Sequence, residues 1–273
     1  DFFFRDHETR LTSTVFITEG KAGRFFEREP LLEYTASQQY REAQRITAAS
    51  TGKSIGTNFW RLLTQLRSES GVAVLPNLKM GERGGDIPAV SGSVVVNGQT
   101  MLARLSARDT EALLMLRNRY ANGVINVPCA APREGDRTEK DIFEVMQVDA
   151  KTRVQAGEAK VRFDVDVDIV GAIGELRCSH VHEPGQEREF AKRTEEQLER
   201  AMLETIKLLQ KHKADALGIG NMIYARNPRL WKKLKPDWGE RFAAAEAHVN
   251  VNVSITSSGM VGGKSTTQKG GRG

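Results

Sequence analysis

The sequence predicts an α+β fold in which antiparallel or mixed β-sheets are each covered by helices, with the chain divided into two domains. Two segments, 159–169 and 249–255, alternate apolar and polar residues with the period of a strand buried on one face. A long segment, 186–213, carries apolar residues at helical spacing and is long enough to cross such a sheet. The regular strand–helix alternation of a parallel α/β sheet is missing from the pattern.

The first part of the chain predicts one strand followed by short helices. A weak alternation over residues 11–18 predicts the strand, and the segments 20–27 and 36–49 are typical of helices. Asn58 is expected to cap a third helix, because an asparagine side chain can accept a hydrogen bond from the first free backbone N–H groups.

A glycine-rich stretch at 81–86 predicts a domain boundary. A short strand over 72–75 is expected to end at Pro76, and the stretch that follows reads Gly-Glu-Arg-Gly-Gly-Asp. We therefore expect residues 1–85 to belong to an N-terminal α+β domain. Residues 86–257 are expected to form a C-terminal α+β domain, with the helix 186–213 packed on an antiparallel sheet.

The C-terminal part carries clear turn and cap signals. Asn97-Gly98 predicts a tight hairpin turn, and Ser106 with Asp109 predicts a capping box at a helix start. The elements expected there are strands over 93–96, 101–104, 124–127, 142–148, 159–169 and 249–255, and helices over 110–117, 186–213 and 228–234.

The composition excludes several classes of protein. Among 273 residues, 39% are hydrophobic and 27% are charged, which is typical of globular proteins and excludes fibrous or wholly disordered chains. The sequence contains no run of 18 apolar residues, so it predicts no transmembrane helix. The net charge is +5, but Lys264, Lys269 and Arg272 account for three of these charges. We expect 258–273 to be a disordered basic tail, and we expect no nucleic-acid binding by the folded body.

The start of the chain and its cysteines carry little further information. The chain begins at Asp1 without an initiator methionine or signal-peptide pattern, which predicts a mature or trimmed fragment. Cys129 and Cys178 are too few for a disulfide framework and match no zinc spacing, so they leave the redox compartment open.

One set of residues suggests a metal. Cys178, His180 and His182 are spaced by two, so on a strand they would share one face, and a thiolate with two imidazoles suits zinc. The alternative, which we favour, is the solvent-exposed end of a strand. We therefore assign no metal ligand.

Two glycine-containing segments resemble nucleotide-binding loops only in part. Thr51-Gly52-Lys53-Ser54 has the end of a phosphate-binding loop but has Thr47 where the first glycine belongs, so a helix end is the preferred interpretation. Gly218-Ile219-Gly220 lacks the third glycine of a dinucleotide fingerprint. We assign no cofactor.

Two charged groups complete the candidates. Asp164, Asp166 and Asp168 form a row on one strand face, which we interpret as a solvated or partner-binding face rather than a catalytic one. Lys232, Lys233 and Lys235 are interleaved with Trp231 and Trp238, a pattern that suits phosphates and bases, but we expect the tryptophans to be buried. We assign no catalytic residue.

From Gly92 onward the sequence resembles the Ger(x)C family, the lipoprotein C subunits of bacterial spore germinant receptors. The segments that carry the resemblance are, in order, 92–96, 105–114, 123–129, 160–169, 213–220, 227–234, 236–238 and 249–255, with 4–11 upstream. The most specific of them reads Lys-Ala-Asp-Ala-Leu-Gly-Ile-Gly and spans 213–220.

This resemblance implies a soluble module that acts in nutrient-triggered germination. Members are expected on the outer face of the spore inner membrane, held by a lipidated N-terminal cysteine that this chain lacks. Their expected partners are the integral membrane A- and B-type subunits of the receptor. The family carries no established catalytic residue, so none is transferred.

The leading hypothesis is therefore a non-enzymatic C subunit of a germinant receptor. One alternative is a metal-dependent enzyme that uses Cys178, His180 and His182. The other is a protein that binds an anionic surface or nucleic acid through its basic tail.

Overall fold

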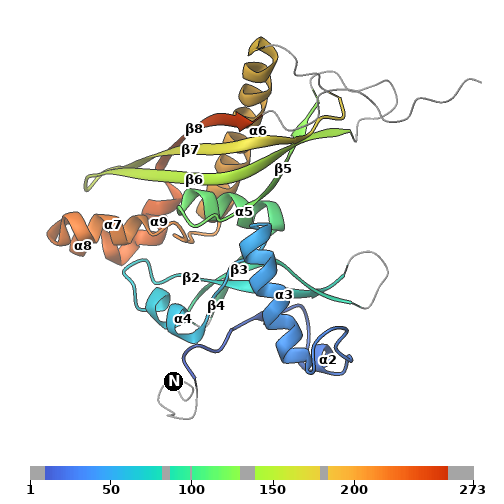
Figure 1. Ribbon diagram of the computed structural model, residues 1–273. Helices are drawn as coiled ribbons and strands as arrows, with labels where there is room; N and C mark the ends of the chain where they lie inside the picture. The colour runs from blue at the N-terminus through green and yellow to red at the C-terminus, as the bar shows by residue number, and fades with distance from the viewer. Residues whose placement is uncertain (1–9, 82–86, 99, 130–138, 179–183, 258–273) are drawn as a thin grey trace, which may run out of the picture.

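The computed structural model confirms the α+β class and describes residues 10–81, 87–98, 100–129, 139–178 and 184–257 (Figure 1). The described strands form two four-stranded sheets, ordered β1-β2-β3-β4 and β5-β6-β7-β8. The predicted tail 258–273 lies outside the described residues, and so do His180 and His182.

The first sheet is built from β1 (Ile17–Thr18), β2 (Ala73–Met80), β3 (Pro88–Asn97) and β4 (Thr100–Leu105). The β1 strand is parallel to β2 and is far shorter than the strand expected over 11–18. The expected end of β2 at Pro76 is wrong. The strand continues to Met80, because a register shift between Pro76 and Leu78 accommodates the proline.

The strands β2 and β3 are antiparallel neighbours, from Ala73 opposite Val96 to Met80 opposite Pro88. The boundary expected after residue 85 therefore falls between two paired strands of one sheet. If the chain separated into two independent domains at this point, the hydrogen bonds between β2 and β3 would be lost and both strand edges would be exposed.

Three helices accompany the first sheet: α2 (Gly23–Phe26), α3 (Ala36–Ser50) and α4 (Phe59–Leu66). The expected cap at Asn58 is confirmed, since its side chain accepts the Arg61 N–H at 2.9 Å. A small core on this side contains Phe25, Tyr40, Leu78 and Val90.

The hairpin β3–β4 leads into α5 (Ala107–Leu116), which lies between the two sheets (Figure 1). Asn97 pairs with Thr100, so the turn begins one residue later than expected. The predicted capping box is confirmed: Ser106 Oγ accepts the Asp109 N–H, and Asp109 accepts the Ser106 N–H. Because α5 is buried against both sheets, one continuous core joins them.

The second sheet contains β5 (Gly123–Pro128), β6 (Lys140–Ala156), β7 (Val161–Glu175) and β8 (Glu246–Ser257). The pairs β5–β6 and β6–β7 are antiparallel, but β7 and β8 are parallel. The sheet under the long helix, expected to be antiparallel, is therefore mixed, as the predicted fold class allows, because the whole helical segment between β7 and β8 forms a crossover connection.

The long helix α6 (Pro184–Lys211) confirms the prediction over 186–213 and packs on β8. Its predicted apolar row is buried throughout: Phe190, Thr194, Leu198, Ala201, Met202, Thr205 and Leu209. The two threonine hydroxyls donate to the carbonyls of Phe190 and Ala201, so their burial leaves no polar group unsatisfied.

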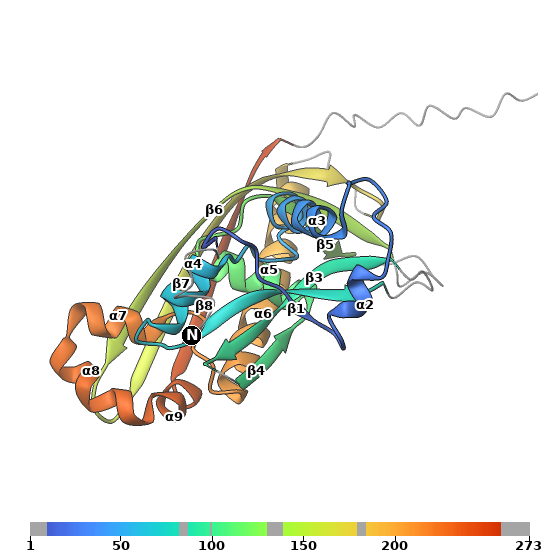
Figure 2. The same cartoon turned by 90° about the horizontal axis from the view of Figure 1, so that it is seen from below.

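Short helices fill one end of the second sheet, where α7 (Ile219–Arg226), α8 (Pro228–Leu234) and α9 (Trp238–Ala243) gather (Figure 2). The 3-10 turn η1 (Lys235–Asp237) joins the last two. Trp231, Trp238 and Phe242 are buried here, so the apolar cluster covers the end of the sheet where β6 and β7 meet.

Candidate functional site

A cleft of about 350 Å³ lies where α5, β5 and α6 meet. Its apolar lining includes Ala112, Met115 and Ile125, all buried, while Lys53, Arg108, Lys140 and Glu111 supply charge. The remaining lining residues are Ala107, Val124, Asn126, Gln197, Leu198 and Ala201. A concave site with an apolar lining and a few converging polar groups is the arrangement typical of small-molecule binding.

Tyr120 fixes the acidic side chain of the cleft. Its hydroxyl donates to Glu111 Oε1 at 3.1 Å. Burial raises the pKa of Glu111 to about 7, an effect that the Tyr120 hydrogen bond and the nearby Lys53 partly offset. Burial, with the neighbouring Glu111, also raises the pKa of Tyr120.

The segment Thr51-Gly52-Lys53-Ser54 contributes to this cleft but does not form a phosphate-binding loop. It follows the end of α3 rather than a strand, as expected for a helix end. Gly52 has a φ of +62° and lies against the Tyr120 ring. Lys53 lines the cleft, and its carbonyl accepts the Gly92 N–H at 2.8 Å.

A second buried polar group lies around Asp215, which is only 2% exposed. Its carboxylate accepts the backbone N–H groups of Gly218, Ile219 and Gly220 at 2.7–2.9 Å. Trp238 Nε1 and Ser70 Oγ donate to the same carboxylate. The N–H groups of Gly218 and Gly220 therefore bind the internal carboxylate of Asp215 at the start of α7, so they are not available to an external anion.

Asp215 also connects the two halves of the chain. Ser70 donates its hydroxyl to Asp215, and it also donates its backbone N–H to Asn221 Oδ1 at 3.0 Å. Glu69 accepts from Trp231 Nε1 and Lys235 Nζ, which hold its pKa below the usual range. The turn before β2 is thus held by polar contacts to α7, α8 and η1.

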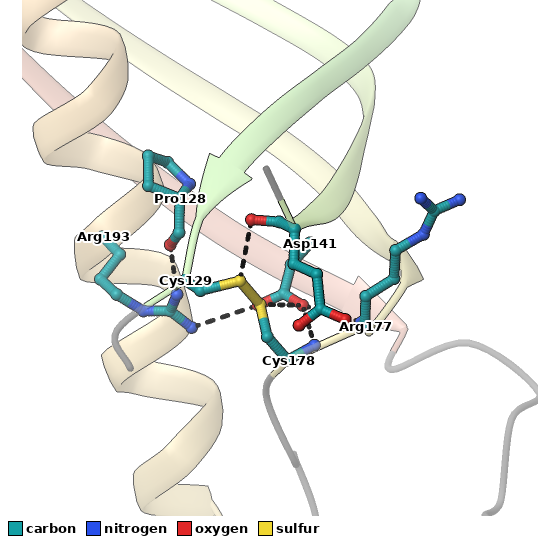
Figure 3. Close-up of a disulfide and its surroundings, with 7 residues drawn as sticks. Pro128, Cys129, Asp141, Arg177, Cys178 and Arg193 are labelled. Carbon is teal, nitrogen blue, oxygen red and sulfur yellow. Dashed lines mark hydrogen bonds and ion pairs between the residues drawn. A yellow bond between two sulfur atoms is a disulfide. The ribbon is translucent and has the colours of Figure 1, made fainter. Parts of the chain in front are cut away.

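The cysteines form a disulfide between Cys129, after β5, and Cys178, after β7 (Figure 3). Cys178 therefore offers no free thiolate, and the expected alternative of a metal set with His180 and His182 loses this ligand. The buried carboxylate of Asp141 lies close to the sulfur atoms of Cys129 and Cys178, and these three groups could in principle bind a metal ion. The two sulfur atoms are bonded to each other, however, so neither is a free thiolate ligand.

Asp141 organises the backbone around this disulfide. Its carboxylate accepts the N–H groups of Arg177 and Cys178 at 2.9 and 3.1 Å and lies 3.6 Å from the Arg193 guanidinium of α6 (Figure 3). Arg193 also donates to the Pro128 carbonyl. This polar group joins the ends of β5 and β7 to the first turns of the long helix.

The aspartate row of β7 lies on the polar face of the second sheet, as expected. Asp164 pairs with Arg162 at 2.9 Å, Asp166 with Arg153, and Asp168 accepts from Asn252 at 3.3 Å. Arg162 holds the pKa of Asp164 below its usual range. Each carboxylate has its own partner, so the row lacks the shared pocket that carboxylate catalysis requires.

The lysine–tryptophan group also differs from a nucleic-acid surface. Trp231 and Trp238 are 2% and 7% exposed, which confirms that they are buried and prevents base stacking. Lys233 pairs with Glu158, and Lys235 pairs with Glu69.

Comparison with protein families shows what kind of chain this is. The family described as "Spore germination B3/ GerAC like, C-terminal" matches residues 91–259, and "Spore germination protein N-terminal domain" matches 1–80. The chain belongs to the spore germination B3/GerAC-like family. The Ger(x)C resemblance is thereby confirmed.

Curated members of this family are distant but match over most of the chain. Spore germination protein YndF of Bacillus subtilis (strain 168) is 22% identical over 96% of this chain. Spore germination protein KC of the same organism is 21% identical over 87% of it. The chain spans 63% and 61% of the lengths of these two proteins.

A solved structure shows the same fold. The crystal structure of the GerBC protein matches with a TM-score of 0.67 and 18% identity, over 94% of this chain and 72% of that chain. The GerAC-like fold thus includes both sheets. Within the described ranges, no helix combines the length and apolar character needed to cross a bilayer.

The sequence signals missed the cleft and the disulfide of this GerAC-like chain. Glu111 and Tyr120 are nine residues apart, and Lys53 is far upstream, so no local motif connects them. The two glycines packed against Tyr120, Gly52 and Gly123, were the available signal. The two cysteines are 49 residues apart, so the only signal for the disulfide in the sequence was the presence of two cysteines.

Proposed function

We propose that this chain is the main soluble part of a C-type subunit of a spore germinant receptor and that it acts without catalysing a reaction. The observation that carries the proposal is the match of GerAC-like family models to residues 1–80 and 91–259. The partnered carboxylates of β7 and the disulfide-bonded Cys178 add support, because neither is prepared for bond-breaking chemistry.

The proposal includes a place in the spore. The whole protein is held on the outer face of the spore inner membrane by a lipidated cysteine that precedes the segment described here. There it contacts the integral membrane A- and B-type subunits and contributes to the response to nutrients. These statements rest on the family resemblance.

One surface of the chain suits such a contact. Between α2 and α3, the apolar side chains of Leu31, Leu32 and Tyr34 are 66%, 94% and 96% exposed, and Phe26, the last residue of α2, is 58% exposed. Large apolar side chains exposed within one short segment are typical of sites of protein contact. We define these four residues as the α2–α3 patch and propose that it meets a membrane subunit.

The test is site-specific crosslinking in spores that carry the full-length protein. A photoreactive residue at Leu32 or Tyr34 should crosslink to an A- or B-type subunit. The same residue at Lys151, on the polar face of the second sheet, is the matched control and should not. Crosslinks from Lys151 alone would refute the patch but keep the receptor role.

A second measurement addresses the receptor role itself. Affinity purification of the full-length protein from spore membranes should recover both membrane subunits. Deletion should abolish the germination response that depends on them. Recovery of neither subunit, with an unchanged germination response after deletion, would contradict the proposal.

A further inference from the structure

The cleft between α5, β5 and α6 has no part in the proposed contact with membrane subunits. It lies at the junction of segments far apart in sequence, since Lys53 comes from the connection after α3, and Lys140 from the start of β6. Its volume of about 350 Å³ falls within the range of small-molecule sites, which begins at about 300 Å³.

The charges that line the cleft favour an anion. Lys53, Arg108 and Lys140 are cationic, and Glu111 is the acidic residue among the lining residues. Arg108 lies 3.5 Å from Glu204 of α6 and so already has an acidic partner. Lys53 and Lys140 are the other two cations of the lining.

Another part of the lining is apolar. Val124 is 45% exposed, and Ile125 and Leu198 are 5% and 4% exposed, with Ala112 and Ala201 beside them in the lining. Asn126 and Gln197 add amide groups that can donate or accept hydrogen bonds. A ligand with a small apolar body and one negatively charged end satisfies both parts.

We propose that this cleft binds a small organic carboxylate, whose charged end meets Lys53 and Lys140 and whose apolar body rests on Val124, Ile125 and Leu198. Glu111 then faces the ligand carboxylate and binds it best as the neutral acid, donating its proton in a hydrogen bond. The charged groups that face Glu111 are Lys53 and Arg108, with the Tyr120 hydroxyl behind it.

The test uses the purified chain with isovalerate as the probe and isovaleramide as its uncharged isostere. Isothermal titration calorimetry should detect isovalerate but not isovaleramide. Replacing Lys53 or Lys140 by methionine should weaken the binding of isovalerate by about tenfold or more, because each variant keeps the length of the side chain but removes its charge. Lys151→Met, on the polar face of the second sheet, is the matched control and should bind isovalerate as the unmodified chain does.

The role of Glu111 has its own readout. Affinity for isovalerate should fall by about tenfold between pH 6 and pH 8 in the unmodified chain, as Glu111 loses its proton. Glu111→Gln should remove this pH dependence, because glutamine stays neutral and can still donate. Absence of isovalerate binding at about 10 mM, equal binding of isovaleramide, or unchanged affinity in Lys53→Met and Lys140→Met would each overturn the proposal.

Discussion

The ring of Tyr120 packs directly on the α-carbon of Gly52, so that a β-carbon at position 52 would overlap the aromatic ring. Gly123 approaches the same tyrosine at its hydroxyl, which a β-carbon at position 123 would overlap. Two glycines thus make the space in which Tyr120 reaches Glu111.

Gly52→Ala should therefore destabilise the protein by about 3 kcal/mol or more, because overlap with a buried ring adds to the backbone cost of a positive φ. Gly71→Ala is a matched control. Gly71 has nearly the same φ, +63° against +62°, but no atom lies within 4 Å of a β-carbon there. Its cost should be about 1 kcal/mol. Urea denaturation measures both, and equal losses would contradict the packing argument.

The raised pKa of Glu111 predicts a pH-dependent stability. Because the folded protein binds this proton more tightly than the unfolded chain does, the contribution of Glu111 is full below about pH 4.5. It is lost as the pH rises through about 7. The loss should reach up to about 3 kcal/mol.

Glu111→Gln provides the comparison for this effect. The difference in free energy of unfolding between the variant and the unmodified chain should change between pH 5 and pH 8, in favour of the variant at the higher pH. A difference that stays constant across this range would show that Glu111 titrates normally.

Asp215→Asn should destabilise the protein by about 3 kcal/mol or more. The asparagine amide has one acceptor oxygen where the carboxylate has two, so some of the buried N–H groups that donate to Asp215 would lose their partner. Asp168→Asn, on the polar sheet face, is the control and should change stability by less than about 0.5 kcal/mol. Thermal and urea unfolding would measure the contrast, and equal effects would refute the role of Asp215.

Loss of the Cys129–Cys178 disulfide should lower the free energy of unfolding by about 2–4 kcal/mol, because the bond closes a long loop in the unfolded chain. The double variant Cys129→Ala, Cys178→Ala should show this loss, and added reductant should then have no further effect. Reductant should destabilise the unmodified chain to the same level. Two titratable thiols in the unreduced protein would contradict the bond.

Local signals in the sequence predicted the elements that depend on local physics. The capping box of Ser106 and Asp109 and the cap at Asn58 form with backbone groups within three residues, so their residue types are sufficient. The buried row of α6 follows from helical spacing in the same way.

Relationships between distant segments were not predictable in this way. Alternating residues in 249–255 predict a strand but not its direction, since parallel and antiparallel neighbours place side chains on the same two faces. The strand through Pro76 depends on a register shift against β3. The cleft depends on Lys53 meeting α5 across a distance in sequence that no periodicity encodes.

The parallel pairing of β7 with β8 has a consequence for biosynthesis. As the polypeptide leaves the ribosome, β5, β6 and β7 emerge long before residues 246–257, which form the neighbour of β7 on its other edge. During that interval the nascent sheet exposes the edge of β7 with which β8 later pairs, and the apolar side chains of Val165, Val167 and Ile169 lack part of the core that buries them in the folded protein. This half of the protein is therefore completed only after residues 246–257 have emerged, and the nascent chain is most prone to aggregate just before that point.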